Sequence, residues 1–166
     1  VKPSAGEILL QGRPLRDQRP AELARIAGVV PQQFSLDFSF TVEEMVAMGR
    51  YAHPAGPRRG SLGGDTDQVA VSAALEATGM TELSGRLVTE LSGGERQRAL
   101  IAQTLAQETP VVLLDEPLNN LDLNHQLEIM QLLARLHAEG RTIVVVLHDL
   151  NMAAQYCDDL VLLEAG

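Results

Sequence analysis

The sequence is poor in the residues that bind polyanions or cross-link a chain. Only one of its 13 Lys and Arg residues is a lysine, Lys2, and the formal net charge is −9. A chain this acidic repels phosphodiester backbones, which argues against a nucleic-acid partner. Its single cysteine, Cys157, cannot form an internal disulfide, a feature that is typical of a reducing compartment.

Long apolar runs and aromatic side chains are scarce as well. No run approaches the roughly 18 residues of a membrane span, and no charged and then apolar leader opens the chain. Aromatic residues make up 3% of the sequence and tryptophan is absent, so aliphatic side chains must fill the core. Because 45% of the residues are hydrophobic, we expect one packed domain, or a large piece of one, that is soluble and cytosolic and can still sit on a membrane partner.

Short apolar segments alternate with helical patterns along much of the chain. The strands that are apolar throughout favour a parallel sheet that is covered on both faces. Strands are predicted over residues 5–10, 27–30, 111–114, 142–147 and 160–163. Helices are predicted over 20–25, 41–48, 65–78, 80–84, 92–108, 123–138 and 149–156, with a turn at 12–14 and loops at 32–40 and 51–64.

A mainly helical stretch interrupts this alternation. We divide the chain into residues 1–31, a partial α/β core, residues 32–90, a helical insert, and residues 91–166, a helix followed by the rest of the core. The predicted fold class is therefore α/β, with a parallel sheet that carries a helical insert.

Two acids, Asp115 and Glu116, directly follow an apolar strand. Ligands of parallel sheets gather at the carboxyl ends of the strands. There one acid can hold Mg²⁺ through water, and the next can orient and deprotonate an attacking water. An acid at this position can also simply cap the following element, but four aliphatic residues followed by Asp-Glu-Pro favour the catalytic interpretation.

An octapeptide with two adjacent glycines opens a predicted helix. Ser92 and Glu95 have the spacing of a capping box, and Gly93 and Gly94 let the backbone approach a ligand without a Cβ atom in the way. The free N–H groups of a helix N-terminus attract anions. This segment can therefore grip a terminal phosphate, although capping boxes also open ordinary helices.

Three further positions are suited to ligands. His148 follows a predicted strand at the same sheet edge as Asp115, where an imidazole can hydrogen-bond a γ-phosphate or water. Gln32 follows another strand, and its amide can reach Mg²⁺ or water; Gln33 can serve instead. Asp122 lies in a turn and is also expected to N-cap the next helix. The remaining histidines have no such position and are expected to be structural: His53, His125 and His137.

Together these motifs resemble the ATP-binding subunit, or nucleotide-binding domain, of an ABC transporter. Val30-Pro31-Gln32 resembles the Q-loop, Leu91–Arg98 the signature motif, Val111–Pro117 Walker B, Asn119-Asn120-Leu121-Asp122 the D-loop, and His148 the switch histidine. These five motifs follow the family's order, and the resemblance covers nearly all of residues 5–166. Glu95 stands where Gln is commoner, and Asn119-Asn120 where Ser-Ala is more familiar.

The resemblance implies that ATP and Mg²⁺ are the cofactors and that each site forms between two subunits. The catalytic residues would be Glu116 as general base, with His148 and Gln32 as sensors of the γ-phosphate, and the metal would be held by Asp115 and Gln32. ATP held by the opposite subunit would contact residues of the signature motif and the D-loop: Ser92, Gly93, Gly94, Glu95 and Asp122.

One part of the family pattern is missing. The Walker A motif, Gly-x-x-x-x-Gly-Lys-Ser/Thr, and the aromatic residue that stacks on adenine do not occur before residue 5. The implied fold is thus a P-loop NTPase-like parallel sheet core with a helical subdomain, truncated at the N-terminus and at the C-terminus. We expect this piece alone to bind ATP poorly, to hydrolyse almost none, and to leave apolar surface uncovered.

The finer resemblance is to importers of iron–siderophore, haem or cobalamin, through Thr41–Arg50 and through Asp115–Asp122 followed by Asn124-His125-Gln126. It implies a homodimer of ATPase subunits, transmembrane permease subunits, an indirect link to a substrate-binding protein, no nucleic acid, and a peripheral seat on the cytoplasmic face of the inner (plasma) membrane. A groove near residues 32–40 would receive a short helix of the permease, with apolar contacts from Phe34, Leu36, Phe38 and Phe40. Two alternatives stay open: a non-transport ABC ATPase, such as one that acts on ribosomes, and a catalytically incomplete ABC domain that only completes a partner's site.

Overall fold

A three-stranded parallel sheet forms the centre of the molecule. The structure is a computed structural model that describes residues 5–32, 39–53, 65–119 and 121–163. Its strands lie in the order β3 (Ala27–Val30), β4 (Val111–Asp115) and β5 (Thr142–Val146). Val111 of β4 lies opposite Ala27 on one side and Thr142 on the other. The parallel α/β core predicted from the sequence is confirmed.

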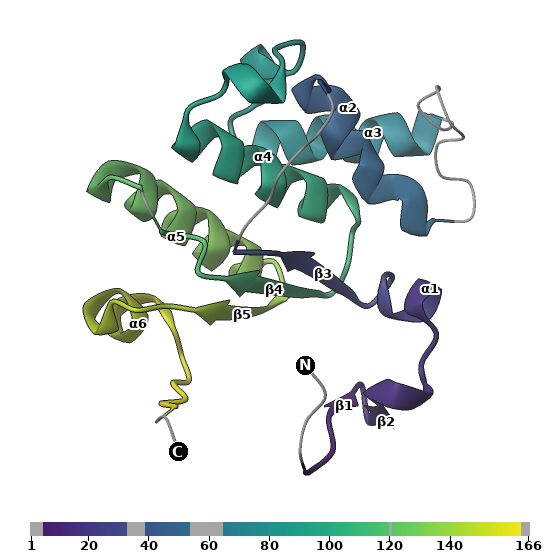
Figure 1. Ribbon diagram of the computed structural model, residues 1–166, viewed down its shortest axis with the longest axis vertical. Coiled ribbons are helices and arrows are strands. Elements are labelled where there is room, and N and C mark those ends of the chain that lie inside the picture. The colour runs from purple at the N-terminus through teal and green to yellow at the C-terminus, as the bar shows by residue number, and fades with distance from the viewer. Residues whose placement is uncertain (1–4, 33–38, 54–64, 120, 164–166) are drawn as a thin grey trace.

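Helices cover one face of this sheet. In Figure 1, α2 (Val42–Ala47), α3 (Asp65–Ala77) and α4 (Gly93–Ala106) form a layer above the strands, next to α5 (Leu123–Ala138). Alternate strand residues Val30, Val112 and Leu114 are at most 2% exposed and share one apolar core with these helices. The core therefore lies between the sheet and the helical layer, and it leaves the strand ends free.

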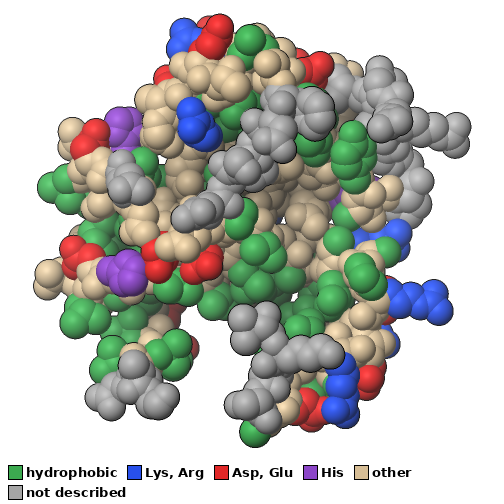
Figure 2. All heavy atoms as spheres, in the orientation of Figure 1, with side chains coloured by type: hydrophobic (Ala, Val, Ile, Leu, Met, Phe, Trp, Pro, Cys, Tyr) green, Lys and Arg blue, Asp and Glu red, His purple; other side chains and the backbone are tan. Residues whose placement is uncertain are grey.

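The opposite face of the sheet is uncovered among the described residues. Val29, Val144 and Val146 alternate with the core residues and are each about half exposed. Figure 2 shows hydrophobic side chains gathered over the middle of the molecule, above a hollow between its two lower lobes. The sequence predicted that helices cover both faces of the sheet. This prediction is wrong for the described residues, because their helices pack on one face. The prediction of uncovered apolar surface is confirmed.

Two helices begin at the residues that their capping boxes predict. Thr41 Oγ1 accepts a hydrogen bond from the Glu44 N–H at 3.2 Å, and the Glu44 carboxylate accepts one from the Thr41 N–H at 2.8 Å, at the start of α2. Ser92 and Glu95 repeat this pair of bonds at the start of α4. Local side-chain chemistry thus fixes where both helices enter the fold.

Several short elements differ from the prediction. The strand expected over 5–10 is reduced to β1 (Leu9–Leu10), which pairs antiparallel with β2 (Arg13–Pro14), where a turn was expected. The apolar residues 160–163 form no strand and are 59–87% exposed. They have the composition of a strand but no neighbouring strand among the described residues, and a lone extended segment gains no ladder hydrogen bonds. The other short elements are η1 (Leu15–Asp17), α1 (Pro20–Leu23), η2 (Met48–Ala52), η3 (Thr81–Leu83), η4 (Val88–Glu90) and α6 (Leu150–Tyr156).

A buried ion pair ties the helical layer together. Arg50 on η2 donates from Nε to Asp67 Oδ1 of α3 at 2.8 Å, and from Nη1 to Glu108 and to the carbonyl of Ala106, both at 2.6 Å. The side chains of Arg50 and Asp67 are only 6% and 3% exposed. Because removal of one member of such a pair leaves a buried charge unpaired, this cluster holds η2, α3 and the end of α4 in one arrangement.

Candidate active site

Glu116 receives polar side chains from three segments of the chain. Gln32 Nε2 donates to Glu116 Oε2 at 2.6 Å, and His148 Nε2 lies 2.8 Å from Glu116 Oε1. Asn119 Nδ2 also donates to Oε2. The Glu116 side chain is 17% exposed, whereas His148 is 70% exposed. The three residues predicted as catalytic therefore lie together, and Asn119 is a fourth member that the sequence reasoning did not predict.

The sheet explains why residues so far apart in sequence meet. Gln32, Glu116 and His148 each follow the carboxyl end of one of the three adjacent parallel strands, which is where ligands bind in open α/β sheets. Glu116 has a φ of 49°, in the left-handed region that non-glycine residues seldom adopt. Such a conformation costs on the order of 1–3 kcal/mol and persists where the surrounding structure holds it, often at functional sites.

The neighbours of Glu116 favour its charged form. The hydrogen bond from His148 lowers the pKa of the Glu116 carboxyl most, and the bonds from Gln32 and Asn119 lower it further, against an opposing effect of burial. The pKa therefore lies below its ordinary value, so the carboxylate is ionised at neutral pH. An ionised carboxylate can accept a proton from water, which is the chemistry that the sequence predicted for this position.

A small cavity lies beside this carboxylate. Its volume is about 120 Å³, and its lining comes from the Glu116–Asn119 turn, the start of α5 and the end of β5. At roughly 30 Å³ per water molecule, the cavity has room for a few waters and none for a nucleotide. A water molecule can thus stand next to Glu116, while a nucleotide would have to approach from outside.

Asp115 and Gln32 offer oxygen ligands at the same edge. Asp115 is exposed, and no hydrogen bond or ion pair is found for its side chain among the described residues. Gln32 uses its Nε2 on Glu116, which leaves the amide oxygen available. The described residues contain no cluster of three His, Cys, Asp or Glu side chains that could hold a metal alone. These two oxygens fit Mg²⁺, which usually takes one or two protein ligands and fills its shell with phosphate and water.

Ser92–Gly94 at the N-terminus of α4 form a separate feature, which we call the diglycine tip. The Ser92 N–H donates to Glu95 Oε2 at 2.8 Å, and this bond does most to lower the pKa of the Glu95 carboxyl. Gly93 is exposed, and a Cβ atom added there would meet nothing within 4 Å; Gly94 is buried. No hydrogen bond or ion pair in the described part of the chain links this tip to Glu116. The structure thus does not bring the predicted phosphate-gripping residues and the predicted catalytic residues into one site.

Asp122 forms the N-cap predicted for α5. Its Oδ1 accepts from the His125 N–H at 3.0 Å, and both of its oxygens lie 2.9 Å from His125 Nδ1. These bonds lower the pKa of the Asp122 carboxyl. The imidazole of His125 also lies against Gly94, so the structure gives this histidine two neighbours that sequence reasoning missed. Of the remaining predicted positions, Gln33, Phe34, Leu36, Phe38 and Asn120 lie outside the described residues.

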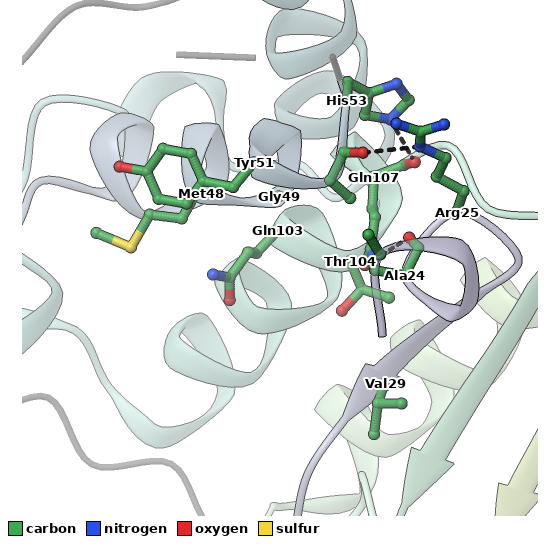
Figure 3. Close-up of a pocket in the computed structure, with 12 residues that line it drawn as sticks. Ala24, Arg25, Val29, Met48, Gly49, Tyr51, His53, Gln103, Thr104 and Gln107 are labelled. Atoms are coloured by element: carbon green, nitrogen blue, oxygen red, sulfur yellow. Dashed lines mark hydrogen bonds between the residues drawn. The ribbon is translucent and has the colours of Figure 1, made fainter. Parts of the chain in front are cut away.

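A larger cavity, of about 670 Å³, lies away from this site. Figure 3 shows its lining, which comes from α1, β3, η2 and α4 and includes Tyr51, Gln103 and Val29. Arg25 Nε donates to the Ala52 carbonyl at 3.0 Å, and the Gln107 side chain donates to the Ala24 carbonyl. Two bonds thus brace the walls of this pocket, which lies between the sheet and the helical layer.

Comparison with known proteins agrees with the sequence motifs. The family model described as "ABC transporter" matches residues 1–119. The chain belongs to the ABC transporter family. A cobalamin import ATP-binding protein of Halobacterium salinarum is 42% identical over all of this chain and 41% of its own length. A petrobactin import ATP-binding protein of Bacillus anthracis is 44% identical over 99% of this chain and 59% of its own. A hemin import ATP-binding protein of Nocardia farcinica is 43% identical over 100% of this chain and 56% of its own length.

Solved ABC structures have the same fold. CbiO1 of Clostridium perfringens, part of the ABC transporter complex CbiONQ, matches with a TM-score of 0.77 at 33% identity over 95% of this chain and 62% of its own. A dimeric bacterial ABC transporter cassette matches with a TM-score of 0.75 at 32% identity, over 93% of this chain and 67% of its own. The chain spans about half the length of the curated relatives that it matches. Among the described residues, no helix has the length and apolar character needed to cross a membrane.

Proposed function

We propose that the protein is the ATP-hydrolysing subunit of an ABC importer. The observation that carries this proposal is the ionised Glu116 carboxylate, held at the sheet edge by Gln32, His148 and Asn119 beside a cavity with room for a few waters. A structural acid at the end of a strand does not need partners from three strand ends or a left-handed backbone. The intact group argues against a domain that only completes a partner's site.

The chain's own residues account for the attack on the γ-phosphate. Glu116 accepts a proton from water in the adjoining cavity and orients that water. His148, exposed on the outer side of Glu116, reaches the γ-phosphate oxygen that the nucleotide presents. Asp115 and the Gln32 oxygen would hold Mg²⁺, which would neutralise charge on the phosphate oxygens when bound.

The diglycine tip serves a second nucleotide in a paired assembly. Gly93 is exposed at the N-terminus of α4, and a Cβ atom added there would meet nothing within 4 Å, so a ligand has room to approach this helix end. Because no hydrogen bond or ion pair among the described residues joins this tip to Glu116, we infer that Ser92 and Gly93 bind ATP held by a second copy of the subunit. A solved relative of this chain is a dimeric cassette, which supports the proposal.

The importer class comes from the relatives. Proteins named for the import of cobalamin, petrobactin and hemin align with 99–100% of the length of this chain. All three cargoes are large chelates that bind or hold a metal, and we propose a cargo of that class, carried by membrane-spanning permease subunits. The subunit itself then sits on the cytoplasmic face of the membrane as a peripheral protein and receives cargo from a substrate-binding protein only indirectly.

Replacement of Glu116 by glutamine tests the proposal in the full-length subunit. E116Q keeps the shape of the side chain and removes the proton acceptor, so ATP hydrolysis should fall by about 100-fold or more, while ATP binding remains. The matched control is E139Q, which changes an exposed carboxylate at the end of α5 and should leave hydrolysis unchanged. Hydrolysis by E116Q at the wild-type rate would contradict the assigned role.

A further inference from the structure

The two glycines of the diglycine tip have different surroundings. A Cβ atom at Gly93 would meet nothing within 4 Å, whereas one at Gly94 would lie 2.8 Å from His125 Cδ2 and 3.0 Å from His125 Cγ. The first distance is shorter than carbon atoms tolerate and the second is at the tight limit, so the imidazole occupies the space that a side chain at position 94 would need. Gly93 is therefore the glycine that is open to a ligand, and Gly94 is the glycine that lets α4 approach α5.

His125 is fixed on its other side by Asp122. The ring nitrogen Nδ1 lies 2.9 Å from both oxygens of the Asp122 carboxylate, and the backbone N–H of His125 donates to the same group at 3.0 Å. A ring held at Nδ1 by a carboxylate has little freedom to turn about its side-chain bonds. One edge of the imidazole thus binds Asp122, while the Cδ2 edge lies against the helix tip.

A second contact extends this junction along both helices. Arg98 lies one turn after Gly94 on α4, and Glu128 lies one turn after His125 on α5. Arg98 Nη1 donates to Glu128 Oε2 at 2.8 Å. The starts of α4 and α5 are therefore joined at two successive turns, with His125 as the contact nearest to the tip.

We propose that His125 is a positioning residue that holds the Ser92–Gly94 tip and Asp122 as one rigid unit. The inference rests on the proposed function, in which Ser92 and Gly93 bind ATP held by the second subunit, and on the contact of Asp122 with the same ATP that the family resemblance implies. If the ring is displaced, the N–H groups of the tip lie in the wrong place when ATP binds, before hydrolysis begins. The kinetic consequence is a higher KM for ATP, with a smaller fall in kcat.

A pair of double-mutant cycles tests the packing and its consequence in the full-length subunit. G94A alone should lose ATP hydrolysis, because its methyl group collides with the ring. Adding H125A removes the ring and should restore activity by a factor of about ten, within the range for residues in contact. H125F keeps a ring in place and should not rescue G94A. G93A should also reduce ATP hydrolysis, because its methyl group lies where the ligand approaches. H125A should therefore not restore the activity of G93A.

Two further readouts separate this inference from the proposed function. Thermal unfolding of the same variants should show coupling between positions 94 and 125 and additivity between 93 and 125, whether or not the subunit hydrolyses ATP. H125A by itself should raise KM for ATP by about threefold or more, whereas a merely structural role would reduce the active fraction and leave KM unchanged. Equal rescue of G93A and G94A, or coupling in stability with an unchanged KM, would overturn the inference. Failure of the proposed function would appear instead as normal hydrolysis by E116Q.

Discussion

Glu116 combines two properties that a general base requires, namely charge at neutral pH and a fixed direction. Its charge is favoured by hydrogen bonds from His148, Gln32 and Asn119, and its direction follows from the left-handed backbone and those same bonds. The strand-end rule predicted that His148 would lie at the same sheet edge as Asp115 and Glu116, whereas Gln32 joined them as a catalytic residue only through the family resemblance. It could not predict the φ of Glu116, which depends on contacts made after folding.

The pKa of Glu116 gives a prediction at the residue scale. Because the folded pKa lies below the ordinary value, the stabilisation from these bonds is complete above the ordinary glutamate pKa. It is lost as the pH falls through the lower, folded value. H148A removes the largest cause and should raise the pKa of Glu116 toward its ordinary value. Titration of the glutamate carboxyl carbon signals by NMR measures this.

H137A is the matched control for that titration. His137 lies 3.3 Å from Asp158, an ion pair in which Glu116 has no part. The H137A variant should therefore leave the titration of Glu116 where it is in the wild type. A Glu116 signal that titrates identically in wild type and H148A would show that His148 does not govern this carboxylate.

Individual helices were predicted well where their ends have local causes. Thr41 and Ser92 each start a helix through bonds to an acid three residues later, and such a pattern is visible in the sequence. The segment 160–163 was predicted wrongly because a strand needs a partner that sequence composition does not reveal. The contact between His125 and Gly94 was missed for the same reason, since 31 positions separate two residues that only packing brings together.

The two capping boxes provide a matched pair of variants at the element scale. S92A and T41A each remove an N-cap hydroxyl, and each should cost about 1 kcal/mol of unfolding free energy. Only S92A alters a helix tip that is proposed to bind ATP, so only S92A should also raise KM for ATP. Denaturant unfolding and steady-state ATPase assays on both full-length variants measure the two effects. Equal KM changes in S92A and T41A would assign Ser92 a structural role alone.

The whole molecule presents the catalytic edge and the large cavity as separate regions. The cavity of Figure 3 lies between the sheet and the helical layer, where Arg50 and its partners hold η2 against α3 and α4. A permease helix seated there would touch both parts of the subunit. We therefore propose this cavity as the seat of a permease helix, although its described lining residues lie outside the range 32–40 that the sequence indicated.

Y51D tests this placement in the assembled transporter. Tyr51 lines the cavity and is 60% exposed, so a carboxylate there should weaken the seat of an apolar helix without disturbing the fold. Uptake of cargo should fall several-fold, while the ATPase activity of the isolated full-length subunit stays unchanged. V69D is the control, because Val69 is 68% exposed on α3 and does not line the cavity. Similar uptake by Y51D and V69D would remove the cavity from consideration as the permease seat.

The central claim is that Glu116 and the diglycine tip of one subunit belong to different ATP sites, and that each site is formed by two subunits. The most direct test uses heterodimers of full-length subunits, purified through two different affinity tags, with E116Q and G93D as the inactivating changes. E116Q in one subunit and G93D in the other should leave one site intact and preserve ATP hydrolysis. Both changes in one subunit beside a wild-type partner should abolish it. The reverse pattern, with activity only when both changes share a subunit, would show that each site forms within one chain and would contradict the account.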